Sequence, residues 1–203
     1  MIVKITFLEG TLGTASANPD VHSEFIASKS ADAAKAKQEV AALPADELVE
    51  KSVTVFSRGE NGEPILWDYQ IKGFLKETLG ILMEYVESAC SLGNAKLSKW
   101  TYKKVVDNAV NVTPRRIPLV MPKGGNITHC VRPLRADTMR GARIALATSE
   151  EVPAGTTIEV EITTLHKKLD ELIVKCLDNG AQKGIGQWRN SGKGRFEWEL
   201  IAE

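Results

Sequence analysis

Apolar residues recur with the period of a helix in two separate segments of the chain. In residues 69–92 they stand three or four positions apart, which places them on one helix face: Ile71, Leu75, Leu79, Leu82, Val86 and Cys90. The same spacing returns in residues 167–182, where the inward positions are Leu169, Leu172, Ile173 and Cys176. Gly180 follows the last of these positions and is predicted to lie just past the end of the second helix.

Alternation of apolar and polar residues predicts strands near both ends of the chain. Residues 2–9 alternate through Ile5 and Phe7, and residues 196–200 alternate through Phe196, Trp198 and Leu200. Between them, residues 52–67 contain two short apolar runs around a Gly- and Asn-containing turn, which is typical of a hairpin. Residues 142–165 predict two strands joined by a turn at residues 153–155.

The other segments carry weaker patterns. Residues 10–20 are mostly small and predict an irregular loop. Residues 30–43 are rich in Ala and Lys and predict a surface helix that ends near Pro44, within a helical insertion at about 28–52. Residues 93–141 are basic and contain several Pro and Gly residues, so short strands and loops are expected there.

This order of elements predicts the fold class. The chain runs strand, helix, hairpin, helix, several strands, helix, strand. Such an order is typical of an α+β protein and not of a regularly alternating doubly wound one. It is compatible with a ferredoxin-like or RRM-like antiparallel sheet carrying an inserted helix and loops. A single domain covering residues 1–203 is expected.

Composition narrows the class further. A hydrophobic content of 43% and a charged content of 26% are those of an ordinary globular protein. No signal peptide and no membrane span is recognisable. The three cysteines form no C-x-x-C pair, so reduced thiols in a cytoplasmic protein are expected. No cofactor and no metal site is predicted, because the Cys and His residues are scattered.

Positive charge is concentrated in two blocks although the formal net charge is zero. Residues 96–145 contain 11 Lys or Arg against two Asp or Glu, and residues 183–195 contain four cations and no acid. One interpretation is a cationic face that meets a polyanion. The other is a solvated basic surface without a partner.

The second block coincides with a glycine run, "GIGQWRNSGKGRF", which lies between a predicted helix and a predicted strand. A dinucleotide fingerprint requires the opposite order, strand before helix. A P-loop requires Ser or Thr after its Gly-Lys, but Lys193 is followed by Gly194. The run could bring its backbone close to a sugar–phosphate strand, with Trp188 stacked on a base. Alternatives are a simple connector and a Trp188 packed in the core beside Phe196.

The glycine run resembles a motif of a known family. Gly184 to Phe196 is similar to the Gly-rich motif near the C-terminus of the RAMP superfamily of CRISPR-associated, RRM-like RNA-binding proteins. The segment "GENGEPILWDYQIKGFLKETL" resembles the family's sequence leading into its first helix, with Lys72 and Gly73 in the matching positions but no Gly-Ser-Ser triplet. "LEGTLGT" weakly resembles the loop after the family's first strand. The segment "RPLRADTMRGARIALATSEEVPAGT" instead resembles hypothetical proteins of temperate phages, so a phage-encoded relative is considered.

The resemblance implies binding of single-stranded nucleic acid, with RNA favoured over DNA, and assembly as a homo-oligomer or with other RAMP-like subunits. The candidate contacts in the loop are Gly184, Gly186, Gln187, Trp188, Arg189, Gly192, Lys193, Gly194 and Arg195. Those outside the loop are Lys72, Arg115, Arg116, Arg132, Arg135 and Arg140. Arginines suit phosphate because their fork of donors binds it bidentately.

Two alternative functions stay open. The first is a metal-independent endoribonuclease, since some RAMP ribonucleases use a histidine after the first strand and some backbone subunits use an acidic loop residue. His22 and Asp20 are the candidates for these roles. The ordinary interpretation of His22 is a surface loop histidine. The second alternative is a phage interaction protein that acts on a host defence component.

Overall fold

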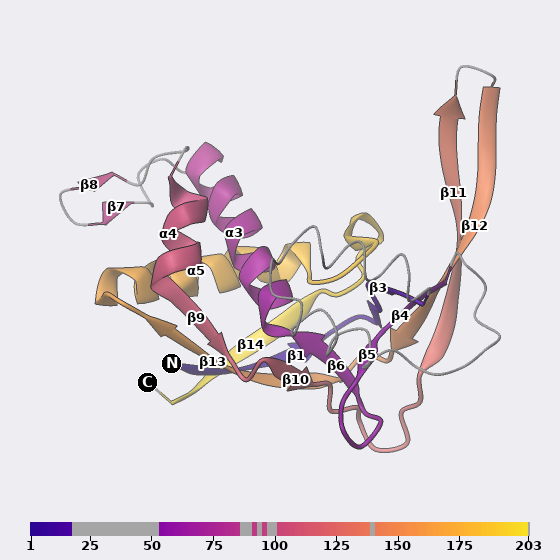
Figure 1. Cartoon of the computed structure of the whole chain (residues 1–203), viewed down its shortest axis with the longest axis horizontal. Helices are drawn as coiled ribbons and strands as arrows, with labels where there is room; N and C mark the ends of the chain where they lie inside the picture. The colour runs from indigo at the N-terminus through magenta and orange to yellow at the C-terminus, as the bar shows by residue number, and fades with distance from the viewer. Residues whose placement is uncertain (18–52, 86–90, 93–94, 97–100, 139–140, 203) are drawn as a thin grey trace, which may run out of the picture.

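The computed structural model describes residues 1–17, 53–85, 91–92, 95–96, 101–138 and 141–202 of the chain. Its central sheet has four antiparallel strands in the order β14–β1–β13–β9 (Figure 1). These strands are β14 (Phe196–Ala202), β1 (Ile2–Phe7), β13 (Thr157–Thr164) and β9 (Val110–Thr113).

Two long helices complete this unit. Helix α3 (Asp68–Tyr85) lies in sequence between β1 and β9, and α5 (Lys167–Lys183) lies between β13 and β14. The chain order β-α-β-β-α-β with this strand order is the ferredoxin-like arrangement. The predicted α+β class with a ferredoxin-like or RRM-like core is confirmed.

The core lies between the sheet and these helices, which cover the same face (Figure 1). Alternate residues of β1 and the apolar stripes of α3 and α5 are buried in it. The inward positions predicted for the first helix are confirmed at Ile71, Leu75, Leu79 and Leu82, whereas Val86 and Cys90 lie outside the described residues. All four inward positions predicted for α5 are buried as well.

Gly180 lies inside α5, so the predicted end of this helix is wrong. The helix continues for three more residues, and its C-cap is Gly184, with φ 83° and its N–H bonded to the Gly180 carbonyl at 2.8 Å. The reason for glycine at 180 is packing against α3. A Cβ there would lie 2.2 Å from Cζ of Phe74. The small residue lets the two helices approach closely.

The basic segment forms longer elements than predicted. Strands β11 (Thr128–Thr138) and β12 (Gly141–Val152) make one long antiparallel hairpin, which projects from the rest of the chain (Figure 1). The prediction of short strands is therefore wrong here, although β10 (Arg116–Pro118) is short. Prolines such as Pro133 led to the prediction of interrupted strands, but β11 is an edge strand, where proline is tolerated.

A helix in the same basic segment was also missed. Helix α4 (Tyr102–Ala109) packs against α3, and Val106 is its one fully buried side chain. The helix has only eight residues, which is shorter than the window of 11–18 residues over which helical periodicity is recognised. The predicted insertion at about 28–52, including its surface helix, lies outside the described residues.

Smaller strands join the projecting hairpin to the body. The predicted hairpin of residues 52–67 is confirmed as β5 (Ser57–Arg58) and β6 (Pro64–Trp67), and β10 pairs with β6. The predicted loop at 10–20 contains two short strands, β2 (Thr11–Leu12) and β3 (Ala15–Ser16). β2 and β4 (Val53–Val55) pair with β12, and β3 pairs with β4. β7 (Ser91–Leu92) and β8 (Ala95–Lys96) form a separate two-stranded pair.

Candidate nucleic-acid interface

The glycine-rich loop, residues 184–195, connects α5 to β14 and contains a short 3-10 helix, η2 (Arg189–Ser191). All four of its glycines have positive φ, between 73° and 99°. Trp188 also has a left-handed backbone, with φ 55°, and it is the one non-glycine residue of this kind among the described residues. The loop therefore has a specific conformation that its glycines make accessible.

Two of these glycines are required by contacts within the chain. Ile185 N–H donates to the Gly194 carbonyl at 2.9 Å, and Gly194 N–H donates to the Gly10 carbonyl at 3.1 Å. A Cβ at Gly194 would lie 1.9 Å from the Ile185 oxygen, and one at Gly184 would lie 2.7 Å from the Gly194 carbonyl carbon. At these two positions the backbone of the loop therefore packs closely against itself. At Gly192 the nearest atoms belong to the Arg195 side chain, 3.9 Å away.

Charges on one side of the loop converge on a glutamate of α3. Arg189 binds Glu77 with two hydrogen bonds, of 2.7 and 3.1 Å, and Lys183 Nζ lies 2.6 Å from the same carboxylate. The hydrogen bond from Arg189 is the main cause that lowers the pKa of Glu77. The carboxylate is therefore charged at neutral pH, and the cluster keeps one net positive charge.

The other two cations of the loop differ in their environment. Lys193 Nζ lies 2.5 Å from Glu151 of β12, and this hydrogen bond raises the pKa of Lys193. Arg195 is exposed and makes no ion pair with any residue that the structure describes. Of the four cations, Arg195 is thus the best placed to meet a phosphate without breaking an existing pair.

The foot of the projecting hairpin meets the loop at Arg132. Its guanidinium lies 5.7 Å from the centre of the Trp188 ring and donates to the side chain of Gln187, which in turn donates to the Gly13 carbonyl. Arg132 is buried, with an exposed fraction of 8%. Trp188, by contrast, is 41% exposed, and Phe196 packs edge-on against Phe74. The alternative that buries Trp188 beside Phe196 is wrong.

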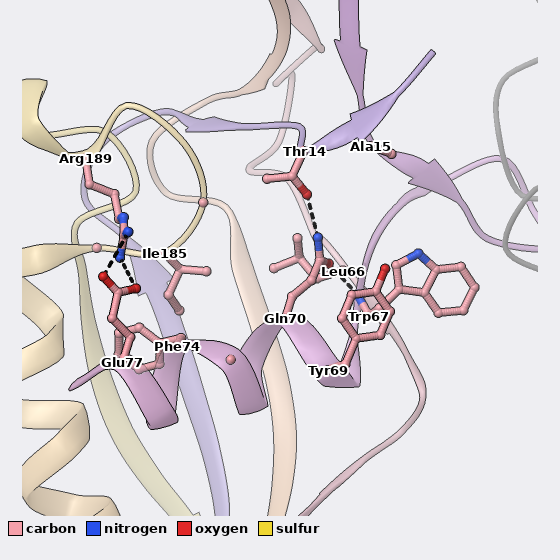
Figure 2. A pocket seen from close by; sticks show the side chains of 13 residues that line it. Thr14, Ala15, Leu66, Trp67, Tyr69, Gln70, Phe74, Glu77, Ile185 and Arg189 are labelled. Carbon is pink, nitrogen blue, oxygen red and sulfur yellow. Dashed lines mark hydrogen bonds and ion pairs between the residues drawn. The ribbon is translucent and has the colours of Figure 1, made fainter. Parts of the chain in front are cut away.

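A groove of about 290 Å³ lies between the loop and the first half of α3. Figure 2 shows the Arg189–Glu77 pair at one end, Gln70 donating to Thr14 Oγ1 farther along, and Tyr69 and Trp67 beyond it. Its walls are mainly apolar and include glycine backbone, and the full lining is Thr14, Ala15, Leu66, Trp67, Tyr69, Gln70, Gly73, Phe74, Glu77, Gly184, Ile185, Gly186 and Arg189. A second hollow shares Gly73 and Glu77 and continues along α3 toward Tyr102.

Arg115 and Arg116 lie near the groove but already have acidic neighbours. Arg115 lies 3.7 Å from Asp68, and Arg116 lies 3.2 Å from Glu60. Both guanidinium groups lie over the ring of Trp67, at 5.2 and 6.0 Å from its centre. These arginines are therefore less free for phosphate than their sequence suggested.

The remaining candidates are dispersed. Lys72 donates to the Asp107 carbonyl at 2.9 Å, on the α4 side of α3. Arg135 is on β11 in the projecting hairpin, and Arg140 lies outside the described residues. His22 and Asp20, the candidates for catalysis, also lie outside them. No group of metal-binding side chains occurs in the part of the chain that the structure describes.

The open face of the central sheet has the opposite charge from the loop. In RRM-like folds this face is the usual platform for RNA, where aromatic side chains stack on bases. Here the outward positions of β13 and β14 include Glu159, Glu161, Glu197 and Glu199, with Lys4 between them paired to Glu199 at 2.9 Å. This acidic face repels a polyanion.

Sequence reasoning missed the residues that complete the groove. Glu77 and Gln70 were not predicted as site residues, because their partners Arg189 and Thr14 are distant in sequence. Tyr69 was missed as well, because the groove that it lines forms only in the tertiary structure. All three, like Trp67, lie in the segment 59–79 that resembles the RAMP sequence leading into the first helix, which was the one available signal.

Comparison with one solved structure supports the fold. A chain of the cryo-EM structure of a type III-B Cmr-β complex bound to cognate target RNA is similar at a TM-score of 0.58 and 13% identity; the match covers 99% of this chain and 59% of that one. A chain of a type IV-B CRISPR complex matches at 10% identity and a TM-score of 0.48, over 99% of this chain and 90% of that one.

The present chain thus spans 59% of the length of the Cmr-β chain. No protein-family model matches the sequence, and no curated protein matches it. No described helix is long and apolar enough to cross a membrane.

Proposed function

We propose that this protein binds single-stranded RNA on the loop face, defined as the glycine-rich loop (184–195), the groove along α3, and the foot of the β11–β12 hairpin. The main observation behind this proposal is that the three elements are distant in sequence but lie together. The Arg189–Glu77 and Arg132–Gln187 contacts join them. The open face of the central sheet is acidic and repels a polyanion, which favours binding on the loop face instead.

The loop face offers the two kinds of contact that a single strand needs. Arg195 and the net positive Lys183–Arg189–Glu77 cluster suit phosphates. The exposed ring of Trp188 suits base stacking, which tolerates any sequence because every base has a π-face. The ring is held in place by its left-handed backbone and by Arg132 beneath it.

Assembly with further subunits is part of the proposal. The fold is similar to a chain in a Cmr-β complex that is bound to target RNA. The resemblance to RAMP proteins points in the same direction, and the long hairpin projects beyond the body, where it can reach a neighbouring copy or RAMP-like subunit (Figure 1).

The test is the salt dependence of binding to a labelled 16-nucleotide RNA, measured by fluorescence anisotropy. Each phosphate neutralised on a single strand adds about 0.7 to the slope of log affinity against log salt. Arg195→Ala should therefore lower the slope by about 0.7. The double variant Arg115→Ala, Arg116→Ala should lower it by less than the roughly 1.4 expected of two free arginines, because both face carboxylates.

Lys168→Ala is the matched control, since Lys168 is exposed at the end of α5 remote from the loop. Its slope should equal that of the unchanged protein. An Arg195→Ala slope equal to that of the control would place the strand away from the loop. Absence of RNA binding at low salt would reject the proposed function itself.

A further inference from the structure

Gly73 occupies a position in α3 where a glycine has no packing reason. It lies in the interior of an 18-residue helix, where glycine costs about 1 kcal/mol relative to alanine. Apart from its chain neighbours and the adjacent backbone of the helix, no atom lies within 4 Å of the place where its Cβ would be. Gly80 and Gly180 differ, because their Cβ positions would meet Tyr102 and Phe74. The missing side chain at residue 73 instead leaves space in the groove.

The groove beside Gly73 has the character of a pocket for a flat, mainly apolar ligand. Its volume of about 290 Å³ is near the lower limit for small-molecule sites. Its walls combine aromatic and aliphatic side chains with bare backbone at Gly73 and Gly186, and the Arg189–Glu77 pair stands at one end (Figure 2). Such walls accept a planar ring, and a bare backbone lets the ring lie close.

We infer that this groove receives one nucleobase of the bound RNA, turned out of the strand and laid against Gly73. The inference rests on the proposed function and deepens it, because the loop face then binds bases at two places, Trp188 and the groove. Turning out a base from a single strand is less costly than from a duplex, since no pairing is lost.

The Arg189–Glu77 end of the groove can form hydrogen bonds with any of the four RNA bases. Arg189 supplies donors, and Glu77 is an ionised carboxylate that only accepts hydrogen bonds. Each of the four RNA bases presents a donor beside an acceptor on its Watson–Crick edge. The pair can therefore bond to any base edge, and the groove selects the presence of a base and not its identity.

The experiment compares two ligands and two variants by fluorescence anisotropy. The ligands are a labelled 16-nucleotide uridine RNA and an abasic ribose-phosphate oligomer of the same length. Gly73→Leu fills the groove, and Glu171→Leu is the control on the exposed side of α5. We expect Gly73→Leu to weaken RNA binding about tenfold, the effect of one stacked base, and to leave binding of the abasic oligomer unchanged. The control should change neither.

Each other outcome overturns the inference. Equal affinity of Gly73→Leu and the unchanged protein for RNA means that no base enters the groove, although the proposed function stands. Equal weakening with both ligands means that residue 73 affects the backbone path or the fold. Binding of neither ligand by the unchanged protein rejects the proposed function and the inference together.

Discussion

Gly194→Ala is expected to destabilise the protein by about 2–5 kcal/mol, which adds the cost of a left-handed alanine to that of overpacking. The residue has φ 73°, and its Cβ would lie 1.9 Å from the Ile185 oxygen. The added Cβ would push Gly194 away from Ile185, and so act against the Ile185 N–H to Gly194 carbonyl hydrogen bond of 2.9 Å. Thermal denaturation should show a melting temperature lower by roughly 5–15 °C.

Gly192→Ala separates the two causes in the same loop. Gly192 has φ 89° but no atom closer than 3.9 Å to its Cβ position. It should therefore lose only the conformational part, about 1–2 kcal/mol. Equal melting temperatures for the two variants would show that the close approach of Gly194 to Ile185 does not contribute to stability. The expectation that both glycines also serve close approach of a nucleic-acid strand stays a prediction, which the RNA affinity of the same two variants tests.

Trp188→Ala is expected to weaken RNA binding by about 1–3 kcal/mol, or about 5- to 150-fold, if one base stacks on the ring. Folding should suffer less, because the ring is 41% exposed and its contact with the buried Arg132 is a cation–π interaction of about 0.5–2 kcal/mol. The two quantities are measured on the same sample, by anisotropy with the 16-nucleotide RNA and by thermal denaturation.

Trp188→Tyr is the matched control, because it keeps an aromatic face over Arg132 at the same backbone. Its affinity should stay close to that of the unchanged protein. An alanine variant that loses several degrees of melting temperature and binds RNA normally would make Trp188 a structural residue. The glycine-rich loop would then be a connector only.

The central elements of this fold were predictable because their patterns are local. The helical stripe through Ile71 and Leu79, and the alternation in β1, follow from burial of one face, which periodicity reports directly. Gly180 was wrongly predicted to lie past the end of the helix, because a glycine after an apolar stripe usually marks a helix end. In the structure a glycine is needed there because Phe74 of another helix packs against it. Long-range packing of that kind leaves no local pattern.

The candidate site was predictable in part for the same reason. The loop was visible as a run of glycines and cations, but the pairing of Arg189 with Glu77 joins residues 112 positions apart. The neutralisation of Arg115 by Asp68 also depends on tertiary structure. The long hairpin was missed because proline and basic residues favour loops locally, while cross-strand pairing with β12 determined the outcome.

Photo-crosslinking with a 4-thiouridine RNA, followed by peptide mapping, tests most directly where the strand lies. We expect crosslinks in residues 184–195 and in the first half of α3, with Trp188 the strongest site, and none in β13. The peptides of β13 and β14 that carry the outward glutamates serve as the internal comparison. Crosslinks concentrated on those outward positions, with few in the glycine-rich loop, would contradict the proposal that RNA binds the loop face.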